Sequence, residues 1–334
     1  MTSPTFPAFV VSEEKGSQKI QREIQQKTFN DLPPGDVLIE VQYSSLNYKD
    51  ALSANGNRGV TKHYPHTPGI DAAGVVVESS VPAWQPGDEV ICSGYDLGMN
   101  TDGGFARYIR VPHSWVVPKP VNMSLLESMQ LGTAGFTAAL CVLALESNGV
   151  KPENGPILIT GATGGVGTIA LQILAGLGYK VVAVSGKSEA RDFLQSFGAD
   201  EVIDRVSFLA NKEKGLLPAT WAGVVDTVGG DILATAIKGT GFDGVVTSCG
   251  NAASGDLPLN VYPFILRGVH LVGIYAANCP MEKRLLVWSK LSKEWKLERL
   301  DALCRRIRLR DLDGEITQML AGKSKGRCVV QLGD

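Results

Sequence analysis

The chain has 334 residues, enough for about two domains, and 44% of them are hydrophobic, which supplies material for packed cores. Its 32 Lys and Arg residues stand against 34 Asp and Glu residues, and this balance excludes a strongly basic nucleic-acid or membrane-surface binder. The 38 glycines form no Gly-X-Y repeat, which excludes a collagen-like chain and favours tight turns and backbone that approaches a ligand.

The first residues, Met1 to Glu14, lack the basic and apolar regions of a signal peptide. The six cysteines are scattered without C-x-x-C or C-x-x-H spacing, so neither a structural zinc site nor a disulfide framework is indicated. We therefore expect a cytoplasmic protein with reduced thiols. The longest uncharged stretch, 154–179, contains a proline and seven glycines, and we expect buried structure there and no membrane span.

The first part of the chain has the pattern of a small β-barrel or sandwich. Apolar residues alternate from Val37 to Tyr43, which is the period of a half-buried strand. Further short strands are expected at 74–77, 89–92 and 108–111, with Pro- and Gly-containing turns between them. This spacing is typical of a compact all-β domain.

After Leu131 the pattern changes to helices that alternate with short apolar strands. The strands are expected at 157–160, 180–185, 201–204, 223–226, 245–248 and 271–274. This alternation predicts an α/β domain with a doubly wound parallel sheet. From Pro280 onward the chain is expected to be helical, with a final strand at 328–332 that returns to the first domain.

A glycine-rich turn follows the first of these parallel strands and precedes a helix at 168–178. The strand–turn–helix order makes this a dinucleotide-binding fingerprint in which Ala162 replaces the first glycine. Gly164 would let the backbone approach a pyrophosphate, and Gly167 would let the helix pack on its strand. The helix N-terminus would supply N–H donors to the phosphates. The predicted phosphate-binding residues are Ala162, Thr163, Gly164, Gly165, Val166 and Gly167.

The end of the next strand bears on the choice between NADH and NADPH. An NAD-selective site usually has an acidic residue there, and this chain has Ser185, Gly186 and Lys187. Ser185 and Lys187 can bind a ribose 2′-phosphate, and Arg205 can reach the same corner, so NADPH is favoured. The remaining parallel strands end in turns that we expect beside the cofactor, at Val228, Cys249, Gly250, Ile274 and Tyr275.

Residues 282–310 contain ten Lys and Arg residues and four acidic residues. A solvated helix face explains this bias, and a contribution to binding a polyphosphate ligand is the alternative.

With these residues in place, the chain resembles the medium-chain dehydrogenases/reductases, and most closely the zinc-free branch of acrylyl-CoA reductases and quinone-oxidoreductase-like proteins. The resemblance covers nearly the whole chain. The matching segments are Asn47–Asp50, Pro68–Gly74, Gly103–Gly104, Gly132–Ala138, Gly161–Gly167, Val225–Gly230, Pro263–Gly268 and Gly326–Arg327.

The resemblance implies a GroES-like β-barrel domain at 1–128 and 277–334, a Rossmann domain at 129–276, NADPH as the cofactor and a homodimer. Zinc-dependent relatives have Gly-His-Glu where this chain has Gly69-Ile70-Asp71, so no metal site is expected. The family's sixth parallel strand commonly ends Gly-Ile-Asp-Ser, whereas this chain reads Gly273-Ile274-Tyr275-Ala276.

By family position, Tyr48 is the expected donor at the substrate, with Asn47 and Lys49 orienting the site; simple packing on the cofactor or barrel is the alternative for Tyr48. Thr137 is expected to touch the nicotinamide, and Arg327 to meet a phosphate or to form a structural ion pair. The implied activity is NADPH-dependent reduction of an activated C=C bond, as in acryloyl-CoA or a small enone. The alternatives are an NADPH:quinone oxidoreductase and an NADPH-binding protein without turnover.

Overall fold

The computed structural model describes residues 4–14 and 19–333; residues 1–3, 15–18 and 334, all within the expected barrel domain, lie outside the described part. Contacts divide the chain into two compact units. The first, which we call the barrel unit, comprises Met1–Thr133, Ala277–Ser292 and Glu298–Asp334. The second, the parallel-sheet unit, comprises Ala134–Ala276 and Lys293–Leu297.

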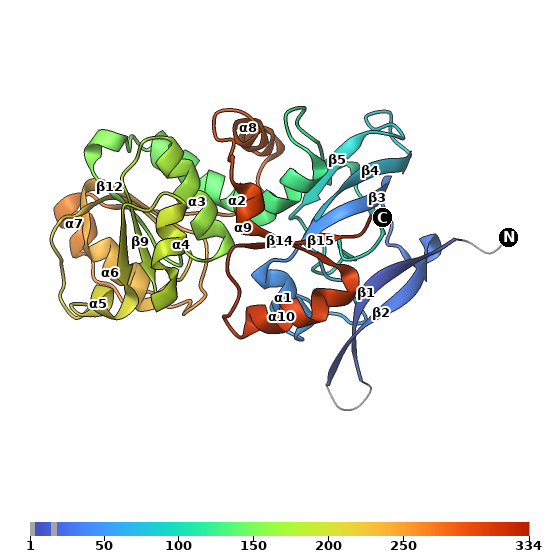
Figure 1. The fold of residues 1–334 in the computed structure, drawn as a ribbon, viewed down its shortest axis with the longest axis horizontal. Coiled ribbons are helices and arrows are strands. Elements are labelled where there is room, and N and C mark those ends of the chain that lie inside the picture. Colours follow the sequence, from blue (N-terminus) through green and yellow to red (C-terminus); the bar gives the residue numbers. More distant parts are fainter. Residues whose placement is uncertain (1–3, 15–18, 334) are drawn as a thin grey trace. The chain divides into compact units, whose positions relative to one another are not determined.

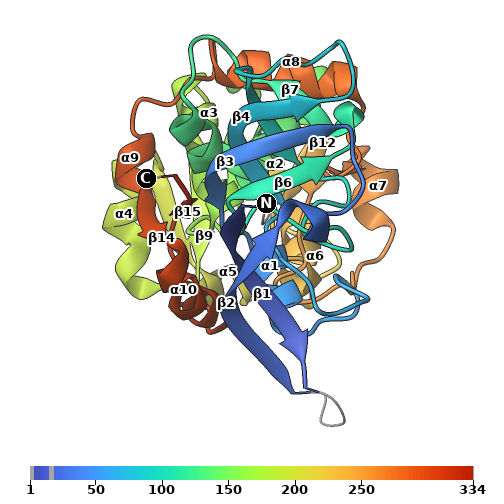
Figure 2. The same cartoon turned by 90° about the vertical axis from the view of Figure 1, so that its right-hand side faces the viewer.

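The barrel unit is built on a seven-stranded sheet (Figure 2). Val37, Ile39 and Val41 are buried on β3 (Val37–Ser45), as their alternation predicts. The strand order is β14-β15-β3-β4-β5-β7, and β6 pairs with β3, which confirms the predicted barrel and the return of the last strand to it. The other strands of this sheet are β4 (Asp71–Ser79), β5 (Glu89–Ser93), β6 (Tyr108–Val111), β7 (Val116–Pro118), β14 (Cys304–Arg308) and β15 (Arg327–Gln331).

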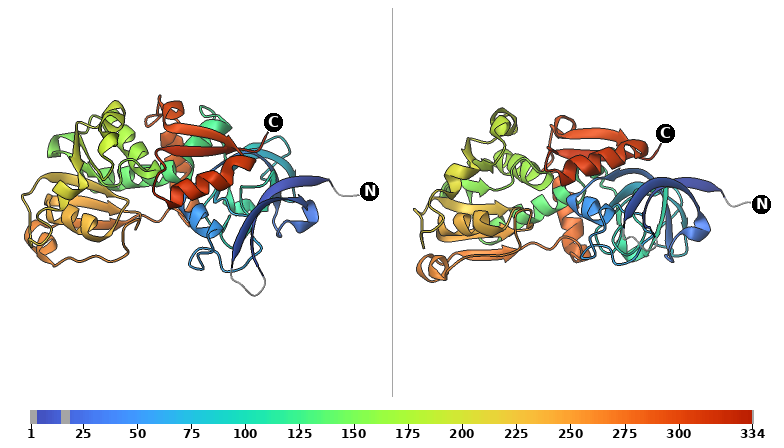
Figure 3. Two further views of the ribbon diagram at one scale, coloured as in Figure 1. Left: turned by 60° about the horizontal axis from the view of Figure 1, so that its bottom comes forward. Right: turned by 90° about the horizontal axis from the view of Figure 1, so that it is seen from below.

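Two parts of the barrel unit differ from the sequence prediction. A hairpin of β1 (Thr5–Glu13) and β2 (Ile20–Thr28) precedes the barrel, and its second strand is polar and largely exposed, so it carries no clear strand period. The prediction of a helical segment from Pro280 to the final strand is wrong at β14, which pairs in parallel with β15. The helices of this unit are α1 (Tyr48–Ala54), α8 (Met281–Leu291), α9 (Leu300–Leu303) and α10 (Leu312–Leu320). Of these, α10 lies beside α1 (Figure 3).

The parallel-sheet unit has the predicted doubly wound fold, with helices on both faces of its sheet (Figure 1). Six strands pair in parallel in the order β10-β9-β8-β11-β12-β13, so the chain starts in the middle of the sheet and adds strands to both sides. The strands are β8 (Ile157–Ile159), β9 (Val181–Ser185), β10 (Glu201–Asp204), β11 (Trp221–Asp226), β12 (Thr240–Ser248) and β13 (His270–Gly273). The helices are α3 (Gly165–Gly176), α4 (Arg191–Ser196), α5 (Arg205–Leu209), α6 (Gly230–Lys238) and α7 (Tyr262–Arg267).

The helical segment α2 (Leu125–Ser147) contains the residue at which the chain leaves the barrel unit. Gly132 interrupts the helix with φ 52° and ψ −156°, a conformation that favours glycine. By length and composition alone, α2 is the one segment of the described residues that could cross a membrane, with a hydropathy of 1.5. Because 83% of its most apolar window is buried, α2 has the properties of a core helix.

Candidate functional site

The glycine-rich turn joins β8 to α3 at the carboxyl edge of the parallel sheet. Gly161 adopts φ 60°, and a Cβ atom there would lie 2.2 Å from Thr227 Oγ1. A Cβ atom on Gly167 would lie 2.6 Å from the carbonyl oxygen of Gly161, so only glycine lets the helix pack this closely on the turn. The hydroxyl of Thr168 donates to the carbonyl oxygens of Ala162 at 2.8 Å and Gly164 at 2.9 Å, which holds the turn in shape.

The twelve-residue helix α3 begins at Gly165, with Gly164 as its exposed N-cap residue. The first-turn N–H groups of a helix have no partner within the helix and carry its positive dipole end. Gly165 and Val166 are partly exposed, whereas Ala162, Thr163 and Gly167 are buried beneath them. The turn can therefore present backbone donors to a pyrophosphate.

The structure brings Ser185, Gly186 and Arg205 together at the neighbouring corner. Ser185 ends β9 and lies in register with Asp204, which ends β10. Ser185 Oγ accepts a hydrogen bond of 3.1 Å from the Lys187 backbone N–H, and the Arg205 side chain lies against the backbone of Gly186. Asp204, for which the sequence indicates no role, accepts hydrogen bonds at its carboxylate from Val206 N and Ser207 N and so caps α5.

The next two strand ends are tied together through Asp226. Its carboxylate accepts hydrogen bonds from Thr160 Oγ1 at 2.6 Å and Gly229 N at 3.0 Å, and burial raises its pKa. The backbone N–H of Cys249 donates to the carbonyl oxygen of Asp226 at 3.0 Å. A hydrogen bond with Cys141, together with burial, raises the pKa of the Cys249 thiol, so this thiol stays protonated.

The other residues of the parallel-sheet unit that are predicted to contact the cofactor range from buried to exposed. A Cβ atom on Gly250 would lie 2.5 Å from the carbonyl oxygen of Thr227, so this position requires glycine. Ile274 donates its N–H to Ser248 O at 2.9 Å and is partly exposed, while the Tyr275 side chain is 65% exposed. Val228 is partly exposed after β11, and Thr137 is buried on α2. Whether these residues touch a cofactor stays a prediction.

In the barrel unit, a buried polar cluster surrounds Asp71. Its carboxylate accepts hydrogen bonds from Ser45 Oγ at 2.5 Å, from Asn47 Nδ2 at 2.7 Å and from both the backbone N–H and the hydroxyl of Thr133. Asp71 and Thr133 therefore hold the chain next to Gly132, where it leaves this unit. Four hydrogen bonds therefore satisfy the buried carboxylate.

Asn47 is the N-terminal cap of α1, and both atoms of its amide are occupied. Nδ2 bonds Asp71, and Oδ1 accepts from Arg327 Nη1 at 3.1 Å. Asp50 closes the cap by accepting from the Asn47 backbone N–H at 2.8 Å and from Ile70 N at 2.8 Å. Burial, with the nearby Asp71 carboxylate, raises the pKa of Asp50 to about 7.

Tyr48 is the first residue of α1 and its side chain is 48% exposed, so its phenol is accessible to a ligand. Arg327 is buried in the barrel unit, where Nε donates to the carbonyl oxygen of Gln130 at 3.0 Å. Of the two roles expected for Arg327, these contacts support the structural one, although its acceptors are the carbonyl oxygens of Gln130 and Leu46 and the amide of Asn47, and not a carboxylate. Its Nη2 has no hydrogen-bond partner among the described residues.

The basic segment 282–310 does not form one solvated helix face. Arg284 on α8 is buried, where it donates to the carbonyl oxygen of Ser93 at 2.9 Å and lies over the ring of Tyr95. Arg305 lies on β14 and forms a paired contact with Glu315.

Within the described residues no group of three or more His, Cys, Asp or Glu side chains could hold a metal ion. Ile70 and Cys92 are buried in the barrel, and burial raises the pKa of Cys92 to about 12.

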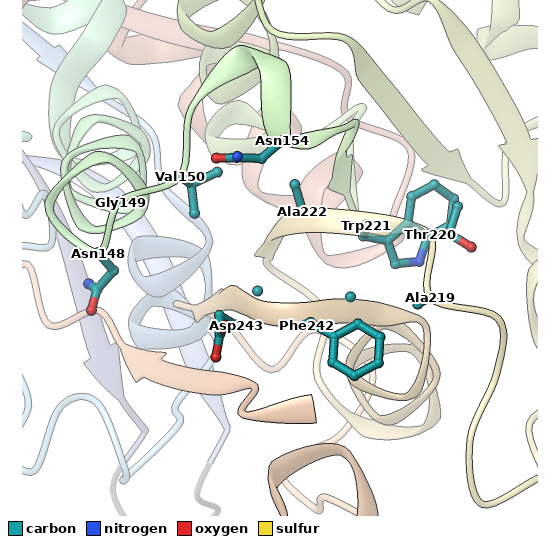
Figure 4. A pocket seen from close by; sticks show the side chains of 12 residues that line it. Asn148, Gly149, Val150, Asn154, Ala219, Thr220, Trp221, Ala222, Phe242 and Asp243 are labelled. Atoms are coloured by element: carbon teal, nitrogen blue, oxygen red, sulfur yellow. The ribbon is translucent and has the colours of Figure 1, made fainter. Parts of the chain in front are cut away.

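Two cavities lie at opposite edges of the parallel sheet. One of about 530 Å³ lies at the carboxyl edge and is lined by Arg205, Gly230 and Ser254, among others. The other, of about 460 Å³, lies at the amino edge, where Trp221 and Phe242 flank the starts of β11 and β12 (Figure 4). Ligands of doubly wound sheets bind at the carboxyl edge, which is the edge of the glycine turn and of the first cavity and not of the second.

Comparison with known proteins gives matches along most of the chain. Residues 33–121 match the alcohol dehydrogenase GroES-like domain, and residues 165–292 match the zinc-binding dehydrogenase family. YhfP of Bacillus subtilis, which is named as a quinone oxidoreductase, is 44% identical over 96% of this chain and 97% of its own. The acrylyl-CoA reductase AcuI of Ruegeria pomeroyi is 41% identical over 98% of this chain and 99% of its own. The crystal structure of a Salmonella enterica oxidoreductase in complex with NADP has a TM-score of 0.94 and 38% identity, covering 97% of this chain and 99% of that one.

Proposed function

The chain belongs to the medium-chain dehydrogenase/reductase family of oxidoreductases, and on that premise we propose that it is a zinc-independent, NADPH-dependent reductase of activated C=C bonds. The substrate class is a small enoyl thioester or enone, of which acryloyl-CoA is the best example. The observation that carries the proposal is the similarity to an acrylyl-CoA reductase at 41% identity over 98% of the chain.

The preference for NADPH is supported by the corner beside the glycine turn. Ser185 and Arg205 lie together there, and the carboxylate of Asp204, the residue before Arg205, is occupied in capping α5. A 2′-phosphate would meet a hydroxyl and a guanidinium at this corner. Changing Lys187 to Ala should raise KM for NADPH by about 10- to 100-fold with little effect on NADH, since a hydrogen bond to a charged group contributes about 1.5–3 kcal/mol. An equal rise in KM for NADPH and for NADH would contradict the proposed recognition of the 2′-phosphate at this corner.

The proposed reaction needs few groups from the protein. NADPH supplies a hydride to the β-carbon of the substrate, which is polarised by its carbonyl group. Negative charge then develops on the carbonyl oxygen, and a nearby donor lowers the barrier. The half-exposed phenol of Tyr48 is the proposed donor, either of a hydrogen bond to this oxygen or of the proton that the α-carbon receives.

The role proposed for Asn47 follows from its contacts. Because its amide bonds Asp71 and Arg327, it acts through Tyr48 by fixing the start of α1, and we assign it as a positioning residue. The zinc-independent proposal is supported by buried Ile70, which occupies the place of a histidine ligand in zinc-dependent relatives and offers no donor.

A quinone oxidoreductase is the second candidate, supported by 44% identity to YhfP. Steady-state assays with NADPH and either acryloyl-CoA or 1,4-benzoquinone distinguish the two. We expect a kcat/KM at least tenfold higher with acryloyl-CoA. A preference for the quinone would favour the second candidate, and tight NADPH binding without turnover of either substrate would contradict both.

We further propose that the protein is a homodimer that pairs through the parallel sheet. β13 is an edge strand on which Leu271 is 39% exposed, and Ile265 and Leu266 of α7, which precedes it in the chain, are also exposed. An exposed apolar edge strand is an aggregation hazard unless it is covered, and a twofold axis would cover it with the same strand of a second copy. Sedimentation equilibrium should give twice the monomer mass, and Leu271→Lys should shift it toward the monomer. A monomeric wild-type protein at micromolar concentration would contradict this proposal.

A further inference from the structure

Gly186 and Arg205 approach each other unusually closely at the corner beside the glycine turn. A Cβ atom on Gly186 would lie 2.7 Å from Cζ of Arg205 and 2.9 Å from its Nε. Real Cβ atoms do not come this near to other heavy atoms, so a side chain at position 186 and the observed guanidinium cannot occupy their places together. The guanidinium therefore lies in space that exists because residue 186 is glycine.

The backbone does not itself require glycine at this position. Gly186 does not adopt the positive φ that restricts other positions of the chain to glycine. An alanine could adopt its conformation without strain, and the obstacle would be the far end of a flexible arginine side chain. The substitution would thus move Arg205 without disturbing the fold.

The observed place of Arg205 suits a ligand. It is the first residue of α5, directly after Asp204, which lies in register with Ser185. Its side chain is exposed and lines the cavity at the carboxyl edge. Among the residues that the structure describes, none forms an ion pair or a hydrogen bond with its guanidinium, and the Asp204 carboxylate is directed to the N–H groups of Val206 and Ser207. The charge of Arg205 is therefore available to an anion next to Ser185.

We propose that Gly186 is a specificity-determining residue for the cofactor, because it leaves the space in which Arg205 can meet the 2′-phosphate. This inference rests on the proposed preference for NADPH and adds a residue that makes no polar contact of its own with the phosphate. It predicts that a single methyl group at position 186 weakens recognition of the 2′-phosphate and leaves recognition of the rest of the nucleotide intact.

Two probes isolate the 2′-phosphate from turnover. Adenosine 2′,5′-bisphosphate and adenosine 5′-monophosphate differ in that one group, and calorimetric titration of the full chain measures the Kd of each without substrate. The variants are Gly186→Ala, Arg205→Ala and the double variant. Gly176→Ala is the matched control, because Gly176 ends α3 with open space around its Cβ position and no positive φ.

We expect Gly186→Ala to raise the Kd of the bisphosphate by roughly 10- to 100-fold, which corresponds to the loss of one charge-assisted contact. The Kd of the monophosphate should stay within about twofold of the wild-type value. Arg205→Ala should give a similar loss, and the double variant should be no weaker than Arg205→Ala, because both changes remove the same contact. Gly176→Ala should leave both Kd values unchanged, and neither Gly176→Ala nor Gly186→Ala should lower the thermal midpoint.

The outcomes separate this inference from the cofactor proposal. If wild-type protein binds the two probes equally, the proposed NADPH preference is wrong and the inference falls with it. A second outcome is that wild type prefers the bisphosphate but Gly186→Ala retains that preference or weakens the binding of both probes equally. In that case the proposed NADPH preference stands, and the proposed role of Gly186 is wrong. Additive losses in the double variant would also contradict it, since they would place Gly186 and Arg205 in independent roles.

Discussion

Asn47 Nδ2 donates a hydrogen bond of 2.7 Å to Asp71 Oδ2, and this contact joins two functionally separate parts of the barrel unit. Asn47 directly precedes Tyr48 at the start of α1, and Asp71 also holds Thr133, the last residue before the chain enters the parallel-sheet unit. The buried Asp71 carboxylate thus holds both the start of α1, where Tyr48 lies, and the segment at Thr133 from which the chain enters the parallel-sheet unit.

The first prediction concerns this carboxylate. Asp71→Asn should lower the thermal midpoint of the barrel unit by roughly 5–10 °C, because an amide N–H₂ would face buried donors that lose their acceptor, at a cost of about 2–3 kcal/mol. Ser45→Ala is the control, because it removes one donor and leaves the carboxylate three others, and it should cost less. Calorimetry measures both midpoints; equal midpoints for Asp71→Asn and wild type would contradict the account.

The second prediction is a pH dependence of stability caused by Asp50. Its pKa is about 7 in the folded protein against an ordinary 3.8, so between these values the folded state holds a proton that the unfolded chain has released. This contribution to stability is fully present below pH 3.8 and is lost as the pH rises through about 7.

The measurement is the free energy of unfolding between pH 5 and 8 for wild type and Asp50→Asn. The wild-type value should fall with a slope of at most about 1.4 kcal/mol per pH unit, and the variant should have a shallower slope. If both proteins had the same slope, Asp50 would not be the titrating group.

The third prediction concerns Tyr48. If its phenol donates only as charge develops in the transition state, Tyr48→Phe should lower kcat and kcat/KM together by about 10²-fold. The retained ring should keep packing and the Kd for NADPH nearly unchanged. Steady-state kinetics with acryloyl-CoA and titration with NADPH measure these effects. A near-normal kcat in the variant would show that the Tyr48 phenol does not take part in the chemical step.

The fourth prediction concerns metal. Activity should survive exhaustive dialysis against EDTA or 1,10-phenanthroline, because Ile70 provides no ligand where zinc-dependent relatives have one. Elemental analysis of the same samples is the control. Stoichiometric zinc whose removal abolishes activity would overturn the zinc-independent proposal.

The sequence predicts the parallel-sheet unit well because its signals are local. Most strands contain a short apolar run, and the glycine turn has steric requirements at Gly161 and Gly167 that only glycine meets. The same reasoning correctly places Arg205 near Ser185, since residues that follow neighbouring parallel strands meet at one edge of the sheet.

The parts that the sequence does not predict depend on tertiary partners. β2 is polar and exposed, so only its pairing with β1 identifies it as a strand, and β14 is rich in arginine and depends on β15. The cluster around Asp71 brings together residues from β3, β4 and α2 that are distant in sequence, and no spacing rule reveals such a network. The packing of Arg205 against Gly186 is invisible for the same reason.

We propose that this protein transfers hydride from NADPH to the β-carbon of an activated alkene. The most direct test is a reaction of acryloyl-CoA with NADPH that carries deuterium at both C4 positions, followed by NMR of the propionyl product. One deuterium is expected at C3 of the propionyl group and none at C2, where the proton arrives from solvent or Tyr48. Oxidation of NADPH without deuterium in the acyl group, or no turnover of acryloyl-CoA at all, would contradict it.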